Sequence, residues 1–349
     1  MPGMPAYNGR RSPTGVNMIN RFSAGYWMAA LLYTVMAAGA GAQTLSPRAL
    51  NAWPERPIRL IMPFPPGGAT DANARALAKE MEIFLGQPLI VDNRGGANAI
   101  IGSDIVAKAA PDGYTLMHIS VAFAINPSTH KKLPFDSIRD FTPITNPIVG
   151  QGALLAVHPS LPARSINELI AVAKKQQLSF SSPGIGNVLH LIAEAFNLRA
   201  GIQMLHVPYK GAGPAMIALL GGETQVMVVP PLIAMPHVRT ERLRALGYSG
   251  AKRLDAMPDL PTIGEAGLPG FQIDTGWHAW FAPAKTPDKI IAQIYGAIHK
   301  SLQLPKLRDY FLAAGYQPTA DPPAQFQKNV QADIKRWGEL VRLAKIAPE

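Results

Sequence analysis

The stretch Pro57-Ile58-Arg59-Leu60-Ile61-Met62-Pro63-Phe64-Pro65-Pro66-Gly67-Gly68-Ala69-Thr70-Asp71 decides the fold. Its apolar run Ile58–Met62, bounded by prolines, predicts a short buried strand. The prolines and glycines that follow cannot continue a strand, because proline lacks the ladder N–H and glycine permits unusual backbone angles. Apolar residues then recur at helical spacing as far as Leu85, with Thr70 or Asp71 as the N-cap.

The end of this stretch suits an anion. A helix start carries N–H groups without an intrahelical partner and a partial positive charge, so it can bind an anion without a cationic side chain. The alternative is an ordinary strand-to-helix connection of an α/β domain. Two prolines and two glycines leave more bare backbone than a turn requires, which favours a ligand.

The front of the chain is typical of a secretory signal peptide, which we place at residues 1–42. No acidic residue and three arginines precede Gln43, and the uncharged segment Ala24–Ala42 ends in small residues. A membrane anchor is the alternative, because the length approaches that of a bilayer span. Met18 is an alternative start, which would make residues 1–17 an upstream extension.

Composition narrows the function. The chain has no Cys, so disulfides and thiolate metal sites are excluded. Its net charge of +10, to which the three leader arginines contribute, fits an anionic small ligand. No basic run with interleaved aromatics occurs, so nucleic-acid binding is not supported. The length predicts two lobes, and the unremarkable surface composition predicts a monomer.

Strands alternating with helices predict an α/β protein with a mostly parallel sheet, whose ligand loops follow the carboxyl ends of the strands. We expect strands at Pro88–Asp92 and Tyr114–Ser120, a polar loop at Ser120–Pro127, and a region at Phe141–His158 that crosses between lobes.

The second half repeats the opening design. Strand Leu178–Ser181 leads into the loop Ser182–Asn187 and a helix from Val188. Thr70 and Asn187 would then face each other across a cleft, where Ser120 and Ser182 add hydrogen bonds to an anion.

Several familiar motifs are incomplete. The glycine pairs at 184/186 and 211/213 lack the third glycine of a dinucleotide fingerprint, so we expect no cofactor. The histidines have no metal-ligand spacing, so we expect no metal. Ala251 stands where a serine hydrolase needs glycine after Ser249. Asp71 is either a general base or a helix-capping carboxylate, and Lys210 either supplies charge to a ligand or is solvated. These residues offer a binding site and no nucleophile with its base.

A set of motifs in a shared order resembles the Bug family, the TctC-like extracytoplasmic solute-binding proteins of tripartite tricarboxylate transport systems. The resemblance covers essentially the whole chain after the leader. It rests on Pro63-Phe64-Pro65-Pro66-Gly67-Gly68 with Asp71, Gly86-Gln87-Pro88, Pro111-Asp112-Gly113-Tyr114-Thr115-Leu116, Leu133-Pro134-Phe135-Asp136, His206-Val207-Pro208-Tyr209-Lys210-Gly211, and Pro261-Thr262 with Glu265-Ala266-Gly267.

The resemblance implies a periplasmic protein of the type II binding-protein class, with two α/β lobes and a ligand cleft between them. We expect lobe 1 at residues 43–151 plus 272–349 and lobe 2 at residues 152–271. The lobes would close around a di-, tri- or aromatic carboxylate and present it to transporter membrane subunits. No residue is expected to be catalytic, and the expected ligand-binding residues are Phe64, Pro66, Gly67, Gly68, Thr70, Asp71, Ser120, Ala122, Asn126, Ser182, Gly184, Gly186, Asn187, Tyr209, Lys210, Val229 and Trp277.

This sequence departs from the family pattern at three positions. Val229 stands where many members have an Asp, which argues for a ligand without an ammonium group. Pro183 and Gly95 change the local loops, which bears on the shape of the pocket. Two alternatives stay open: an exported enzyme that uses Asp71, His190 or His278 as acid or base, and a ligand sensor without a transporter.

Overall fold

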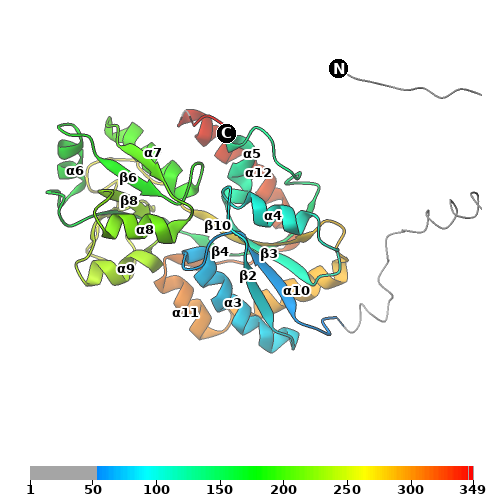
Figure 1. Ribbon diagram of the computed structural model, residues 1–349. Coiled ribbons are helices and arrows are strands. Elements are labelled where there is room, and N and C mark those ends of the chain that lie inside the picture. Colours follow the sequence, from blue (N-terminus) through cyan, green and yellow to red (C-terminus); the bar gives the residue numbers. More distant parts are fainter. Residues whose placement is uncertain (1–52, 345, 349) are drawn as a thin grey trace, which may run out of the picture. The chain divides into compact units, whose positions relative to one another are not determined.

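The structure, a computed structural model, describes residues 53–344 and 346–348. This part of the chain contains ten helices and eleven strands in two sheets (Figure 1). The expected signal peptide, residues 1–42 with its extension 1–17, lies outside the described residues. Among the described helices, none has the length and hydrophobicity that a membrane crossing needs.

The first sheet is mixed, with the strand order β11-β4-β10-β3-β1-β2. Its three earliest strands are parallel, so their following loops share one edge, as expected. β10 runs antiparallel to β3 and β4, and β11 runs antiparallel to β4, so the prediction of a mostly parallel sheet is wrong. The strands are β1 (Ile58–Met62), β2 (Leu89–Asn93), β3 (Thr115–Ser120), β4 (Phe141–Gly150), β10 (Gly276–Pro283) and β11 (Tyr316–Pro318).

The second sheet has the order β7-β6-β8-β5-β9. β6 is parallel to β7 and β8, whereas β5 is antiparallel to β8 and β9. Its strands are β5 (Leu154–Val157), β6 (Ser179–Ser182), β7 (Leu205–Pro208), β8 (Val226–Val229) and β9 (Arg244–Tyr248).

Helices cover both sheets (Figure 1). The first sheet is accompanied by α3 (Ala69–Leu85), α4 (Ile100–Ala107), α5 (Ala122–Thr129), α10 (Asp288–Leu302), α11 (Pro305–Ala313) and α12 (Pro323–Leu343). The second is accompanied by α6 (Ile166–Ala173), α7 (Val188–Ala200), α8 (Ala212–Leu220) and α9 (Pro231–Arg239).

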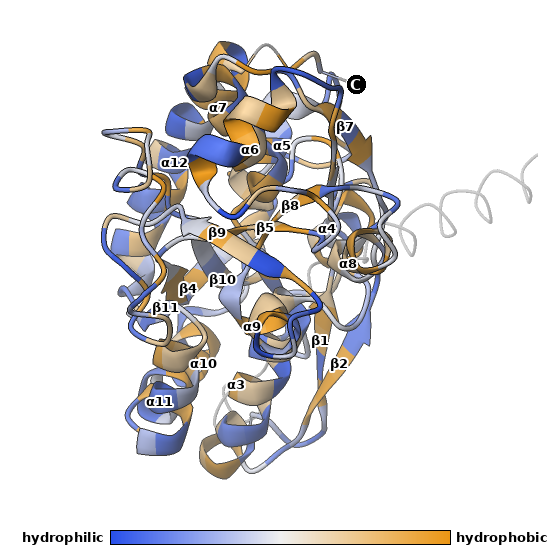
Figure 2. Cartoon of the chain, turned by 90° about the vertical axis from the view of Figure 1, so that its left-hand side faces the viewer, coloured by the Kyte–Doolittle hydropathy of each residue, from blue (hydrophilic) through white to orange (hydrophobic). Residues whose placement is uncertain are grey.

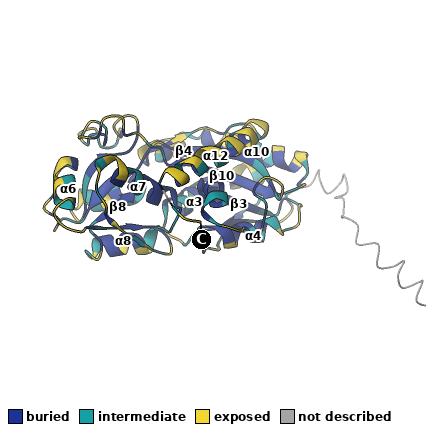
Figure 3. Cartoon of the chain, turned by 90° about the horizontal axis from the view of Figure 1, so that it is seen from above, coloured by how far each residue is buried: buried dark blue, intermediate teal, exposed yellow. Residues whose placement is uncertain are grey.

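Burial follows the amphipathic pattern of the sequence. α3 buries Ala74, Leu77, Ala78 and Met81, which recur at helical spacing, and Figure 2 shows hydrophobic and hydrophilic residues alternating along it. In Figure 3 the buried residues lie on the strands, whereas exposed residues line the outer faces of α6, α10 and α12. The strands and the inner helix faces therefore form the core.

The strand region expected at Phe141–His158 crosses between the two sheets, because β4 belongs to the first sheet and β5 to the second. Ser249 ties the crossing segments together. Its hydroxyl accepts from the Ala153 N–H at 2.9 Å and donates to the Ile273 carbonyl at 2.8 Å. Ser249, which lacks the motif of a hydrolase nucleophile, is buried and links the β4–β5 connection to the segment before β10.

Three elements differ from the sequence predictions. The expected loop Ser120–Pro127 is mostly helix α5, because the residues from Ala122 to Ile125 are buried and packing favours a compact turn of helix. α9 was not expected, although Pro231 occupies the first helical position, where proline is favourable. β11 was not expected, because only three residues form it.

Candidate functional site

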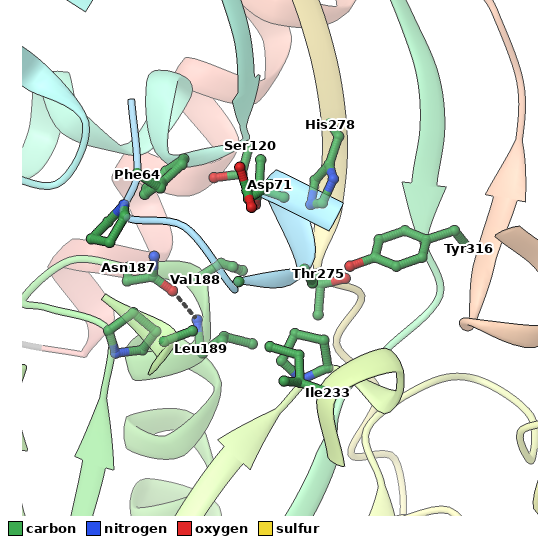
Figure 4. A pocket seen from close by; sticks show the side chains of 17 residues that line it. Phe64, Asp71, Ser120, Asn187, Val188, Leu189, Ile233, Thr275, His278 and Tyr316 are labelled. Carbon is green, nitrogen blue, oxygen red and sulfur yellow. Dashed lines mark hydrogen bonds between the residues drawn. The ribbon is translucent and has the colours of Figure 1, made fainter. Parts of the chain in front are cut away.

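One pocket is lined by both helix starts that the sequence singled out (Figure 4). Gly68 and Thr70 come from the start of α3, and Asn187 and Val188 come from the start of α7. The pocket holds about 610 Å³ of empty space, including solvent at its mouth. Thr70 and Asn187 therefore line the same pocket.

The start of α3 has no side-chain cap. Its N-cap is Gly68, in an extended conformation with φ −83° and ψ 165°, and no side chain caps the first turn. The prediction of Thr70 or Asp71 as N-cap is wrong, since both lie inside the helix. The first-turn N–H groups have no intrahelical partner, so they are available to a guest in the pocket.

Asp71 braces the loop that precedes α3. It accepts from the Gly67 N–H at 3.1 Å, from Arg75 Nε at 3.1 and 3.2 Å, and from Asn93 Nδ2 at 2.9 Å. Asn93 Nδ2 also donates to the Phe64 carbonyl at 3.0 Å. Asp71 therefore accepts a hydrogen bond from the Gly67 N–H, just before the helix, and fixes the loop from within the first turn.

These contacts keep Asp71 charged. Burial alone would raise the pKa of this carboxyl, but hydrogen bonds from Arg75, Asn93 and the Gly67 amide outweigh burial and hold the pKa below its usual range. A general base that works near neutral pH needs the opposite shift.

The start of α7 carries a side-chain cap. Asn187 Oδ1 accepts from the Leu189 N–H at 3.0 Å, drawn as the dashed line in Figure 4. One first-turn amide is therefore occupied, while the Val188 N–H and the Asn187 side-chain amide remain as donors. This start offers fewer backbone donors than the start of α3.

Two stacked histidines hold the loop Ser182–Asn187. The rings of His190 and His206 lie 3.8 Å apart between centroids. His206 Nε2 is 2.6 Å from Ser182 Oγ, and the Gly186 N–H donates to His190 Nδ1 at 3.2 Å. Burial, with the neighbouring His190, lowers the pKa of His206 to about 4, so the His206 ring is neutral at pH 7.

The part of the pocket that α9 lines has no charged side chain. Pro230 and Ile233 from the start of α9 line it with Thr275, His278 and Tyr316 (Figure 4). His278 Nδ1 accepts from the Asn73 amide at 3.3 Å, and burial lowers the pKa of His278 to about 3. Among the described residues that line the pocket, none is Lys or Arg, and the acidic one is Asp71.

The structure sorts the predicted ligand-binding residues into three groups. Six line this pocket: Phe64, Gly68, Thr70, Asp71, Ser120 and Asn187. Four line only an adjacent cavity, which shares Phe64 with the pocket: Pro66, Gly184, Tyr209 and Lys210. Neither cavity is lined by Gly67, Ala122, Asn126, Ser182, Gly186, Val229 and Trp277.

Most residues of the third group have structural partners elsewhere. Asn126 exchanges hydrogen bonds of 2.8 Å with Asn98. The Trp277 indole N–H donates to Asp333 of α12 at 2.7 Å. Val229 is fully buried in a core cluster of the second sheet. Sequence spacing places such residues near a site without showing where their side chains point.

Sequence reasoning missed several lining residues. Pro183 and Val188 belong to a loop and a helix that were identified, so their neighbours carried the signal. Thr275 and Tyr316 flank strands far along the chain, and no local pattern marks them as part of the site. Tyr316 belongs to β11, which reaches the site through its pairing with β4, and a local sequence pattern does not reveal such pairing between distant strands.

In the part of the chain that the structure describes, no group of three or more His, Asp or Glu side chains could hold a metal ion. The geometry supports recognition of a small guest by backbone amides, hydroxyls and neutral rings.

The fold and this site define a binding protein with a small-molecule pocket. The model of the tripartite tricarboxylate transporter family receptor, TctC, matches residues 73–346. The chain therefore belongs to the TctC family. Protein BugT of Bordetella pertussis is 37% identical to it over 302 residues, covering 85% of this chain and 92% of BugT. The expected membership of the Bug and TctC-like proteins is confirmed.

Solved structures agree. Rpa4515 of R. palustris, solved with adipate, is similar with a TM-score of 0.82 and 31% identity, over 85% of this chain and all of that chain. MatC of Rhodopseudomonas palustris, solved with bound malate, is similar with a TM-score of 0.75 and 31% identity, over 83% of this chain and all of that chain. The family includes periplasmic binding proteins, so the expected type II-like α/β fold and the class of solute-binding protein are confirmed.

Proposed function

We propose that this protein captures a small carboxylate in the pocket between the starts of α3 and α7. One observation carries the proposal. The N-termini of α3 and α7, helices that accompany different sheets, line one pocket, and none of the described residues that line this pocket is Lys or Arg. Amides of a helix start stabilise an anion through hydrogen bonds and the helix dipole. The relatives solved with adipate and malate support this choice of ligand class.

Contacts between the two halves support capture by closure. We take lobe 1 as residues 43–151 with 272–349 and lobe 2 as residues 152–271. The loop before α3 packs closely against the start of α8: a Cβ on Gly211 would lie 2.9 Å from Pro65 Cγ. A Cβ on Gly186 would lie 2.6 Å from Thr129 Cγ2. A guest that contacts both lobes favours the arrangement that makes these contacts.

The protein would work in the periplasm as a monomer, after removal of residues 1–42, and deliver its ligand to the membrane subunits of a tripartite tricarboxylate transporter. The family of the chain supports the partner, and the basic, apolar leader supports export. Uptake of a labelled ligand that requires both this gene and the membrane subunits would test the transport role. Uptake that persists without the membrane subunits would favour the role of a sensor.

Binding is tested by thermal unfolding of the purified protein with a panel of carboxylates and the corresponding neutral amides. At a hundredfold excess over Kd a ligand adds about 2.7 kcal/mol to the unfolding free energy. We expect such a shift with a carboxylate and a smaller radius of gyration by X-ray scattering. Unchanged melting and scattering with every carboxylate would contradict the proposal.

The alternative of an exported enzyme is tested with the same ligands. Turnover of a bound carboxylate that an Asp71→Asn change abolishes would establish catalysis. We expect recovery of the ligand unchanged after prolonged incubation, because Asp71 is engaged by Gly67, Arg75 and Asn93.

A further inference from the structure

The two ends of the pocket differ in the charge they can accept. At one end the uncapped start of α3 meets the starts of α7 and α8, since Ala212 lines the same pocket and a Cβ on Gly68 would lie 3.8 Å from the Ala212 Cβ. Several helix starts with free amides therefore converge where one carboxylate would sit.

At the other end a helix start also reaches the pocket, but it has few donors. α9 begins at Pro231, which has no N–H, and the Ile233 N–H already donates to the Pro230 carbonyl at 3.1 Å. The side chain of Ile233 projects into the pocket in place of a polar group (Figure 4). This start therefore cannot hold an anion as α3 can.

The remaining groups at this end are neutral. His278 stays uncharged because burial lowers its pKa to about 3, its Nδ1 lies 3.3 Å from Asn73 Nδ2 of α3, and Thr275 and Tyr316 bring hydroxyl groups. Arg75 of α3 is bound to Asp71 and Asn93. A carboxylate buried at this end would lose its water without gaining a cation, which costs several kcal/mol.

We infer that the ligand carries a single carboxylate, held by the helix starts, and an uncharged body whose far end is apolar or hydrogen-bonding. This inference rests on the proposed function, and it assigns Ile233 as a residue that determines specificity. The inferred ligand therefore differs from adipate and malate, the dicarboxylates in the structures of Rpa4515 and MatC. The ammonium of an amino acid is disfavoured too, because both oxygens of Asp71 are occupied.

The test uses pairs of ligands that match in length and differ in one charge. Protein purified from the full-length gene is titrated calorimetrically with adipate and adipamate, succinate and succinamate, and terephthalate and 4-carbamoylbenzoate. In every pair that binds, we expect the monoamide to bind at least ~10-fold more tightly than the dicarboxylate, because its amide needs no cation.

A substitution then moves the preference. Ile233→Lys places a cation at the uncharged end, so the ratio of the two affinities should shift toward the dicarboxylate by at least ~10-fold. Ile217→Lys is the control: Ile217 is 70% exposed on α8, does not line the pocket, and should leave the ratio unchanged. Melting temperatures check that both variants fold. If Ile233→Lys does not fold, the ligand pairs titrated into the wild-type protein decide the question.

The outcomes separate the two proposals. Dicarboxylates that bind wild type as tightly as their monoamides, or more tightly, overturn the single-carboxylate inference and leave carboxylate capture standing. A panel in which no carboxylate binds overturns both. Equal ratios in wild type and a folded Ile233→Lys variant remove the role assigned to Ile233.

Discussion

The starts of α3 and α7 have the same design of strand, glycine- and proline-containing loop and helix, yet they differ in what fills the first turn. The start of α3 has glycine at the N-cap, and its nearby carboxylate, Asp71, turns back to the loop. At the start of α7, the Leu189 N–H donates to the Asn187 side chain. The helix without its own cap is the one prepared for an external anion, whereas the capped helix contributes chiefly through its side chain.

The largest expected effect comes from capping α3 artificially. Gly68→Asp places a carboxylate where the guest should bind, and the extended backbone accepts it because a Cβ meets only Ala212 at 3.8 Å. We expect carboxylate affinity to fall at least ~100-fold, about 2.8 kcal/mol. The melting temperature should hold, since an acidic N-cap is favourable. Calorimetric titration and thermal unfolding measure the two quantities.

Gly68→Ala is the control for this change, because it adds bulk without charge and should keep most of the affinity. Asn187→Asp is the matched change in α7, where the cap is retained and one charge is added. An Asp at position 68 that leaves affinity intact would show that the α3 amides do not hold the ligand.

The second prediction concerns Asp71, which braces the loop before α3. Asp71→Asn should lower the unfolding free energy by about 1–2 kcal/mol at pH 7, because it weakens charge-assisted bonds with a half-exposed Arg75. The folded pKa of Asp71 is lowered, so its contribution is full above the unfolded pKa near 3.8 and is lost as pH falls through the lower folded value. Denaturant unfolding at pH 7 and below pH 3.8 measures this, and the difference from wild type should shrink in acid.

Lys108→Gln is the control for Asp71→Asn. Lys108 and Asp104 form an ion pair with the same spacing along a helix, but Lys108 is 67% exposed. Its loss should cost less than ~0.5 kcal/mol. Equal losses for the two variants would mean that Asp71 is an ordinary surface partner and does not brace the loop.

Sequence reasoning was accurate where a local pattern carries the signal. The strand predicted at Ile58–Met62 and the helix predicted from Val188 agree with β1 and α7, because apolar residues and the flanking proline- and glycine-containing segments specify them. α5 was missed because Pro127 signals a loop, while tertiary burial of its neighbours overrides that signal. The far end of the pocket was missed because Thr275, His278 and Tyr316 meet Ile233 only through pairing and packing between distant segments.

The third effect separates the two uses of a cap. Asn187→Ala removes the bond to the Leu189 N–H, so the unfolding free energy should fall by about 1 kcal/mol. Affinity should also fall, by about tenfold, because a donor to the ligand is lost. Ser165→Ala removes the cap of α6, which accepts from the Glu168 N–H at 3.2 Å and does not line the pocket. Ser165→Ala should lower the unfolding free energy by a similar amount and leave the ligand affinity unchanged. A loss of affinity in Ser165→Ala would mean that capping acts on binding through stability alone.

The last prediction concerns the acid response of the α7 loop. The folded pKa of His206 is about 4, below its usual value of 6.5, so between these values the unfolded chain binds a proton that the folded chain does not. Stability is therefore full above pH 6.5 and falls as pH decreases toward 4. His206→Gln should flatten this part of the profile. Because the folded protein keeps His206 neutral down to about pH 4, affinity at pH 5 should match that at pH 7 while the unfolding free energy is already lower. If affinity falls in step with stability, the histidine stack is opening in the folded state and the α7 start is the weaker half of the pocket.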